Sequence, residues 1–264
     1  MALFENIGKR IIAWINIFYE TLELVLETGY WIIVGPFRHK PIKWEAVFAQ
    51  MVFMGVQSVV IVFFVMLFTG VVLAMQAAPQ LENMGAIFYV ASLVSISICR
   101  ELGPVLTALV VAGRIGAAIT AEIGSMKVNE QIEALETMGI SPVRYLVVPK
   151  VLALFFMLPC LTVVGDVSGA LGGYLIGVNN LDINSGLYLQ TAFKFVTLKD
   201  IYTGLSKSFV FAIIIAIVGS YQGMKTDGGA VGVGRSTTVS VVTSFVLIIV
   251  ADSFMTAIYF FSDM

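Results

Sequence analysis

Long apolar runs with few or no charged residues alternate with short polar segments from about residue 46 onward. A helix needs roughly 20 mostly apolar residues to cross ~30 Å of bilayer hydrocarbon. Five runs supply that length, the fourth only with a few flanking residues, and they span 52–75, 87–111, 151–178, 208–222 and 239–261. The pattern therefore predicts an all-α polytopic membrane protein with five transmembrane helices.

The first 45 residues follow a different pattern. Apolar side chains recur there at helical spacing, but charged side chains interrupt them too often for a spanning helix. The apolar positions are Ile7, Ile11, Trp14, Ile15, Phe18, Leu22 and Leu26, and the charged ones are Lys9, Arg10, Glu20, Glu23 and Glu27. We expect an N-terminal amphipathic interfacial helix within 1–45, followed by a transmembrane core over 46–264.

Composition limits both the fold class and the classes of function that the chain can have. Hydrophobic residues make up 59% of the chain and charged residues 12%, against roughly 45–50% and about 25% in an ordinary soluble protein. The net charge of −2 argues against an electrostatic nucleic-acid binder. His39 is the single histidine, and no cluster has metal-ligand spacing, so we predict no catalytic residue and no metal site. The nearest approach to a P-loop, at 219–226, has the wrong spacing, so this chain is predicted not to be an enzyme.

The distribution of basic residues predicts the orientation in the membrane. With the N-terminus in the cytoplasm, eleven of the fifteen Lys and Arg residues fall on the cytoplasmic side and three on the other. Arg100 remains within the membrane. Such a bias is typical of the positive-inside rule and favours a cytoplasmic N-terminus.

Charged residues inside the apolar runs are candidates for function. Arg100 and Glu101 lie in the second run, Asp166 in the third and Asp252 in the fifth. A charge at that depth costs ~2.5–3.5 kcal/mol on insertion scales, which makes it a functional-site hypothesis. Two interpretations stay open: Arg100 lines a cavity, or it pairs with Asp252 or Asp166 and locks helices together.

Glycine and proline add two predictions about helix geometry. Gly103 and Pro104 follow the charged pair directly, and because proline lacks a backbone donor we expect a helix break or hinge there. Four glycines also repeat at every fourth residue of the third run, which favours close approach of another helix, within the subunit or across a dimer. These are Gly165, Gly169, Gly173 and Gly177.

The segment between the second and third runs predicts a short amphipathic helix over about 127–139. Carboxylates are spaced by three along it, beside an apolar ridge. The two sets are Glu130, Glu133 and Glu136, and Ile132, Leu135 and Met138. Gly139 fits a C-terminal cap, and Pro142 prevents continuation. The segment is either a solvated connector on the membrane surface or, as the ridge and the abrupt end favour, a helix that docks into a partner's groove.

The same segment carries a family resemblance. Its Glu133-Ala134-Leu135-x-x-x-Gly139 resembles the E-A-A-x-x-x-G coupling loop by which ABC permeases dock on their ATPase subunits. More specifically, five motifs within 100–150 resemble the signature of the MlaE family, the permeases of MCE-type ABC lipid transporters. They are Arg100-Glu-Leu-Gly-Pro104, Ala112-Gly-Arg114, Ala121-Glu-Ile-Gly124, Glu130-Gln-Ile-Glu-Ala134 and Met138-Gly-Ile-Ser-Pro142. Lys150 departs from the pattern, since arginine is more usual there.

The resemblance implies an assembly that composition does not reveal. It implies one permease domain over 1–264, forming a homodimer in the bacterial inner (cytoplasmic) membrane. Two cytoplasmic P-loop ATPases (MlaF-like) would dock on the coupling helix and carry ATP and Mg²⁺, so that this chain needs no cofactor. A periplasmic MCE hexamer (MlaD-like) and a STAS-domain protein (MlaB-like) are further implied partners. The system would move glycerophospholipid between inner and outer membranes and so maintain outer-membrane lipid asymmetry.

Residues are assigned to the two implied tasks from their depth and position. We expect the coupling contact to use Glu130, Glu133, Leu135, Glu136 and Gly139. We expect an outward-facing lipid cavity between protomers, in which apolar side chains suit acyl chains and Arg100 contacts a phosphate. Lys207, at the outer end of the fourth run, is expected to attract the anionic headgroup. The cavity set is Leu73, Gln76, Leu81, Arg100, Glu101 and Lys207.

Two alternatives use the same residues differently. An ion-coupled secondary transporter would use Asp166, Asp252 and Glu101 as titratable relays. The chain shows no internal repeat, which counts against this class. A membrane scaffold without transport would leave the intramembrane charges with a structural role alone.

Overall fold

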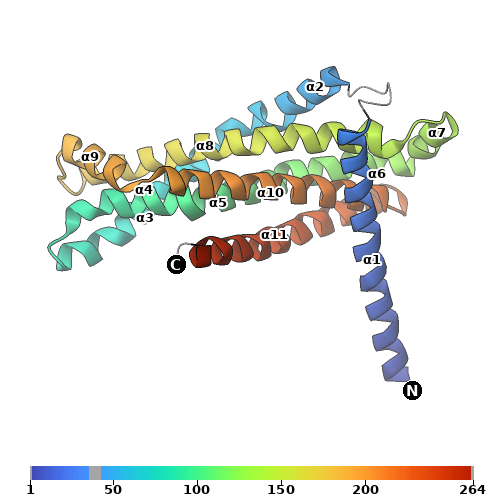
Figure 1. The fold of residues 1–264 in the computed structure, drawn as a ribbon, viewed down its shortest axis with the longest axis horizontal. Helices are drawn as coiled ribbons and strands as arrows, with labels where there is room; N and C mark the ends of the chain where they lie inside the picture. Colours follow the sequence, from blue (N-terminus) through green and yellow to red (C-terminus); the bar gives the residue numbers. More distant parts are fainter. Residues whose placement is uncertain (1, 36–42, 263–264) are drawn as a thin grey trace.

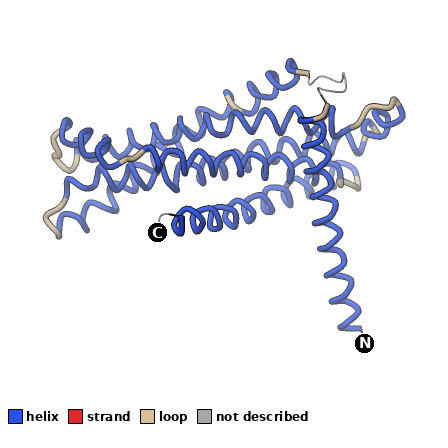
Figure 2. Tube along the Cα trace, viewed as in Figure 1, coloured by secondary structure: helices blue, strands red, loops and turns tan. Residues whose placement is uncertain are grey.

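The computed structural model describes residues 2–35 and 43–262. Within those ranges the chain is helical apart from short connections, and no strand occurs (Figure 2). The helices in the first half are α1 (Ala2–Ile33), α2 (Trp44–Met54), η2 (Val56–Ser58), α3 (Val59–Asn83), η3 (Ile87–Tyr89), α4 (Val90–Ser97), η4 (Ile98–Leu102), α5 (Gly103–Val111), η5 (Ala112–Gly116) and α6 (Ala117–Val128). Those in the second half are α7 (Gln131–Thr137), η6 (Val143–Val147), α8 (Val148–Asn179), α9 (Ser185–Phe195), α10 (Leu198–Met224) and α11 (Gly229–Ser262).

Five helical units are long and apolar enough to cross a membrane. Each contains one of the five predicted runs and extends beyond it, so the predicted all-α polytopic class is confirmed. The largest extension is in the second unit, which continues seventeen residues past the predicted run. The units are Trp44–Asn83, Ile87–Val128, Val143–Asn179, Leu198–Met224 and Gly229–Phe261.

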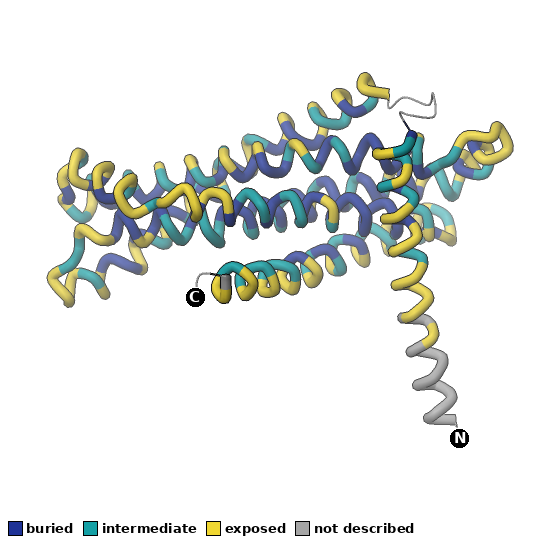
Figure 3. Tube along the Cα trace, in the orientation of Figure 1, coloured by how far each residue is buried: buried dark blue, intermediate teal, exposed yellow. Residues whose placement is uncertain are grey.

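The second, third and fourth spans form the centre of the bundle. α8 packs along α3 and also contacts α5 and α10, while α10 contacts α6 and α11 (Figure 1). Buried residues concentrate on these inner helices (Figure 3). By contrast, α3 and α11 expose large apolar side chains such as Phe64, Phe68, Val242 and Phe254. In a membrane these outer faces meet lipid or another protomer.

The glycines of α8 allow α3 to approach closely. A Cβ on Gly70 of α3 would fall on the carbonyl oxygen of Gly169, and one on Gly172 would fall on the carbonyl oxygen of Leu67. Gly173 and Gly177 instead make room for the Tyr188 side chain from α9. The predicted close approach is therefore confirmed, and it occurs within the subunit.

The second span is continuous through Gly103 and Pro104, so the predicted helix break is wrong. The span contains two π-helical turns, η4 and η5, and η4 ends directly before Gly103. Gly103 keeps helical dihedrals (φ −57°, ψ −61°), and Pro104 lies in the first turn of α5. A wide π-turn accommodates a residue without a backbone donor, and this removes the need for a kink.

α1 runs across the direction of the bundle, and the C-terminal part of α1 is the part that meets the bundle (Figure 1). The predicted helix is present, and it exposes large apolar side chains that include Ile15, Phe18 and Leu26. Its contacts with the bundle are polar as well as apolar. The Tyr221 hydroxyl donates to Glu20 at 2.8 Å, and Lys225 forms an ion pair with the same carboxylate.

Candidate functional site

The coupling segment is a short helix at one end of the bundle, beyond the end of α6 (Figure 1). α6 continues to Val128, Glu130 then adopts a left-handed conformation (φ 57°), and α7 covers only Gln131–Thr137. The predicted helix over 127–139 is therefore too long at both ends. The turn at Glu130 ends one helix and starts another at a new angle, which periodicity alone does not reveal.

Gly139 ends α7 in a Schellman motif. Its φ is +71°, its N–H donates to Glu136 O at 2.9 Å, and the N–H of Ile140 donates to Leu135 O at 3.0 Å. This pair of bonds satisfies the last carbonyl groups of the helix. The residue-level prediction of a glycine cap at this position is confirmed.

The apolar ridge of α7 points into the chain's own core, which corrects the expectation that it docks into a partner. Ile132 and Leu135 are 5% and 9% exposed and belong to the main hydrophobic core. Met138 is exposed instead. A helix this short cannot bury its apolar face alone, so it uses the end of the bundle.

An ion pair braces α7 against α6. Lys127, in the last turn of α6, donates to Glu133 of α7. This hydrogen bond lowers the pKa of the Glu133 carboxyl. Glu130 and Glu136 are exposed. The surface that α7 offers to a partner is thus acidic, and Glu133 belongs to the internal brace.

A second set of functional candidates surrounds Lys207 inside the bundle. The ammonium is fully buried and lies 2.5 Å from Glu101 Oε2, 2.9 Å from Asp252 Oδ1 and 2.8 Å from Thr256 Oγ1. The Thr256 hydroxyl donates to Glu101 Oε1 at 3.0 Å. We define these four residues as the Lys207 cluster. It joins η4, α10 and α11, so its main effect is to hold three spans together.

This arrangement corrects two expectations. Lys207 does not present its charge to an open cavity, because its donors are occupied by Glu101, Asp252 and Thr256. Arg100 pairs with neither Asp252 nor Asp166; its Nη1 lies 4.0 Å from Asp200 Oδ1, and its side chain remains 39% exposed. Asp200 is anchored in a capping box with Thr197 at the start of α10.

Asp166 of α8 is separate from these pairs. Its Oδ1 is buried without a hydrogen-bond partner and lies against Gly103, where a Cβ would collide with it. Position 103 therefore requires glycine, because any side chain there would collide with the Asp166 carboxyl group. This is a packing reason for the Gly103-Pro104 pair that the hinge hypothesis did not include.

The remaining predicted cavity residues lie along α3. Leu73 and Leu81 are partly buried against the core, and Gln76 is exposed. In the described part of the chain no hydrogen bond or ion pair links them to Arg100 or to the Lys207 cluster. Among the described residues, no group of three His, Cys, Asp or Glu side chains could hold a metal ion.

Asp200 and Thr256 were missed by sequence reasoning. Thr256 follows Asp252 by four residues, so both lie on the same face of α11. That spacing could have indicated that Thr256 shares a site with Asp252. Asp200 follows Thr197 by three, which is the spacing of a capping box, and it would have placed the start of α10 correctly.

Comparison with known proteins assigns the chain to a family. The family model described as permease MlaE matches residues 47–258. A probable ABC transporter permease protein of Rickettsia bellii is 43% identical over 220 residues, which cover 83% of this chain and 85% of the relative. Proteins with the same description from Synechocystis and Porphyra purpurea are 42% identical over 211 residues (80% of each chain) and 34% identical over 230 residues (87% of this chain and 86% of the relative). This chain belongs to the MlaE permease family and is a multi-pass ABC transporter permease.

Proposed function

We propose that this chain is the permease of a phospholipid transporter that is energised by separate ATPase subunits docked on α7. It acts as a homodimer in the inner membrane of a bacterium, with its N-terminus in the cytoplasm. Its partners are two MlaF-like ATPases, a periplasmic MlaD-like MCE hexamer and a MlaB-like STAS protein. ATP and Mg²⁺ bind to the ATPases, and the lipid moves between inner and outer membranes.

The observation that carries the proposal is the way α7 is attached. Ile132 and Leu135 fix it to the core, and the Lys127–Glu133 pair fixes it to α6, while Glu130 and Glu136 stay exposed. A helix that is rigidly joined to a span and open on one face transmits the movement of whatever binds that face. α6 continues the second span, which also carries Arg100 and Glu101.

Arg100 is the residue we assign to the lipid phosphate. Its guanidinium is partly exposed, and Asp200, the one carboxylate that contacts it in the described part of the chain, lies at the limit of ion-pair distance. A guanidinium offers several donors in a plane that matches phosphate oxygens. The acyl chains would occupy an apolar space between protomers, next to Leu73, Gln76 and Leu81 of α3. Lys207 takes a different role from the expected one, because its ammonium forms ion pairs with Glu101 and Asp252 inside the bundle.

The test is ATP-driven transfer of a labelled phospholipid in proteoliposomes that contain the permease and its ATPases. Arg100→Ala should lose most transfer while ATPase docking and thermal stability stay unchanged. Arg235→Ala removes an exposed arginine at the start of α11 and is the matched control. Full transfer by Arg100→Ala, or an equal loss in the control, contradicts the assignment.

One observation favours the ion-coupled alternative: Asp166 Oδ1 is buried without a partner. The other two proposed relays, Glu101 and Asp252, are both paired with Lys207, and an ion-paired carboxylate is a poor relay. Transport that needs no ATPase and follows the membrane potential would support this alternative and defeat the main proposal.

A further inference from the structure

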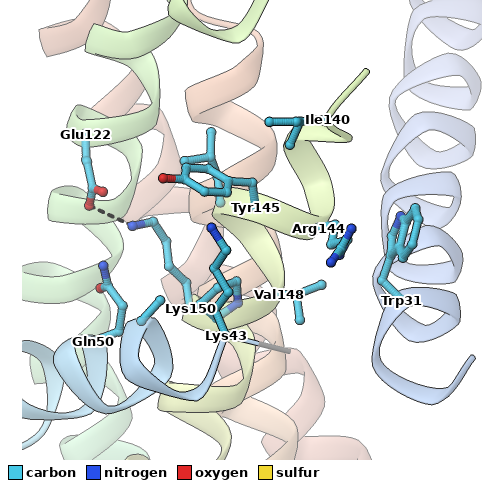
Figure 4. Close-up of a pocket in the computed structure, with 12 residues that line it drawn as sticks. Trp31, Lys43, Gln50, Glu122, Ile140, Arg144, Tyr145, Val148 and Lys150 are labelled. Atoms are coloured by element: carbon cyan, nitrogen blue, oxygen red, sulfur yellow. Dashed lines mark hydrogen bonds and ion pairs between the residues drawn. The ribbon is translucent and has the colours of Figure 1, made fainter. Parts of the chain in front are cut away.

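A pocket of about 340 Å³ lies where α1 meets the bundle, near the end that carries α7. This volume is within the range of roughly 300–1,000 Å³ that is usual for small-molecule sites. Figure 4 shows its walls, which come from the end of α1, the start of α2, α6, and the segment from Ile140 to Lys150. None of its lining residues belongs to the Lys207 cluster or to the proposed lipid cavity.

The charges in the pocket favour an anion. Lys43, Arg144 and Lys150 line it, and Glu122 is the single acidic lining residue. Lys150 is buried and already paired with Glu122 at 2.7 Å. Among the described residues, no carboxylate lies within ion-pair distance of Lys43 or Arg144. Within the described ranges, these two positive charges therefore have no carboxylate partner.

Aromatic rings hold these two cations in place. Lys43 Nζ lies 5.0 Å from the centre of the Tyr145 ring, and the Arg144 guanidinium lies 5.4 Å from the Trp31 ring. The nearby Glu27 carboxylate accepts hydrogen bonds from Trp31 Nε1 at 3.1 Å and from Ser141 Oγ at 3.0 Å. Both donors are neutral and both bonds end on Oε1, so Glu27 keeps its negative charge, but among the described residues it forms no ion pair with Lys43 or Arg144.

The position of the pocket identifies the kind of anion. α1 crosses the direction of the bundle (Figure 1), and an amphipathic helix of this kind lies among lipid headgroups. Trp31 and Tyr145 fit the aromatic belt found at the same depth. A basic cavity between helices at this depth is the usual form of a site for an acidic lipid headgroup.

We propose that this pocket binds the phosphate of an anionic phospholipid from the leaflet in which α1 lies. Arg144 and Lys43 contact the phosphate, and Gln50, which also lines the pocket, donates through its carboxamide nitrogen. Lys150 and Glu122 form the inner wall. The lipid joins α1 and α2 to the segment that follows α7. It is a resident lipid rather than cargo, and the inference does not depend on the proposed transport function.

The experiment is native mass spectrometry of the purified full-length protein, titrated with phosphatidylglycerol or with phosphatidylcholine. Lys43→Gln/Arg144→Gln should lower the apparent affinity for phosphatidylglycerol ~30-fold, from the contribution that each basic residue makes at an anionic surface. Lys194→Gln/Arg235→Gln removes the same charge from two exposed residues elsewhere and should leave binding unchanged. Lys43→Gln alone, at an exposed side chain, gives a readout even if Arg144 is needed for folding, and should show part of the loss.

The outcomes separate the sources of the phosphate. Preference for phosphatidylglycerol that is lost in the pocket variant, and that millimolar inorganic phosphate does not displace, supports the proposal. Equal phosphatidylglycerol binding by the pocket variant and its control overturns it. Displacement by inorganic phosphate would show a small-anion site and would also overturn the lipid assignment.

Discussion

The coupling segment and the Lys207 cluster are built in opposite ways. The polar contacts of α7 join residues near it in sequence, since Lys127 and Glu133 are six positions apart and the Gly139 cap uses bonds within five residues. Lys207 meets Glu101 across 106 positions and Thr256 across 49. One end of the molecule can therefore change locally, whereas the cluster ties three spans into one unit.

Removal of the central cation should have the largest effect. Lys207→Met leaves Glu101 and Asp252 without their partner, and we expect a loss of about 3 kcal/mol, near the low end for a broken buried pair because both carboxylates are partly exposed. Thermal unfolding in detergent measures it. Lys194→Met, at an exposed lysine of α9, is the control. Equal melting temperatures of the two variants would show that the cluster does not hold the spans.

Strain at the end of α7 should cost less. Gly139 has φ +71° with no atom near a would-be Cβ, so Gly139→Val adds backbone strain alone, roughly 1–2 kcal/mol. Gly139→Asn tolerates the left-handed conformation and should cost less. Hydrogen exchange should show the loss confined to α7 and its flanks. Loosening of the Lys207 cluster in the valine variant would contradict the independence of the two regions.

The α1 anchor at the same end should respond to pH. The hydrogen bond from Lys225 lowers the pKa of Glu20, and the hydrogen bond to Glu20 raises the pKa of Lys225. The Glu20 contribution is therefore complete above its unfolded pKa near 4.5 and is lost as the pH falls through the lower folded value. The Lys225 contribution is lost as the pH rises through its raised value. After solvent screening the pair is worth at most about 1 kcal/mol.

Proteolysis of α1 as a function of pH measures this anchor. Cleavage should be slow at neutral pH and should increase at acidic pH below the unfolded pKa of Glu20. Glu20→Gln should be cleaved faster already at neutral pH. A flat profile in the unmodified protein would show that the pair does not anchor α1.

Substitution on the exposed acidic surface of α7 should have the smallest effect on the stability of the permease and the largest effect on docking of the ATPase subunits. Glu136→Lys changes a side chain that is exposed to solvent, so the free energy of unfolding should stay within about 0.5 kcal/mol. Co-purification with the ATPase subunits should nevertheless be lost. Glu82→Lys, an exposed carboxylate at the end of α3 away from α7, is the control. Retained ATPase binding by Glu136→Lys would defeat the docking proposal.

Sequence reasoning predicted the structural features that depend on residues close together in the chain. It found the five spans and the Gly139 cap, because apolar length and left-handed glycine are local properties. It did not find the pairing of Lys207 or of Arg100, because those partners lie on other spans and periodicity carries no information on which helices are adjacent. The amphipathic ridge of α7 shows the same limit. Ile132 and Leu135 had to be covered, but only the fold shows that this chain covers them itself.

The two π-helical turns of the second span change the phase of that helix. Each holds one residue more than an α-helical turn, so a helical wheel drawn through η4 is wrong by about 100° for the residues that follow. η5 adds the same error again fourteen residues later. The second span is thus one continuous helix made of three α-helical segments, and the side chains of each segment differ from those of the next in rotational phase about the helix. Insertion or deletion of one residue at either turn would rotate the far segment and move the surface of α7 to another side of the bundle.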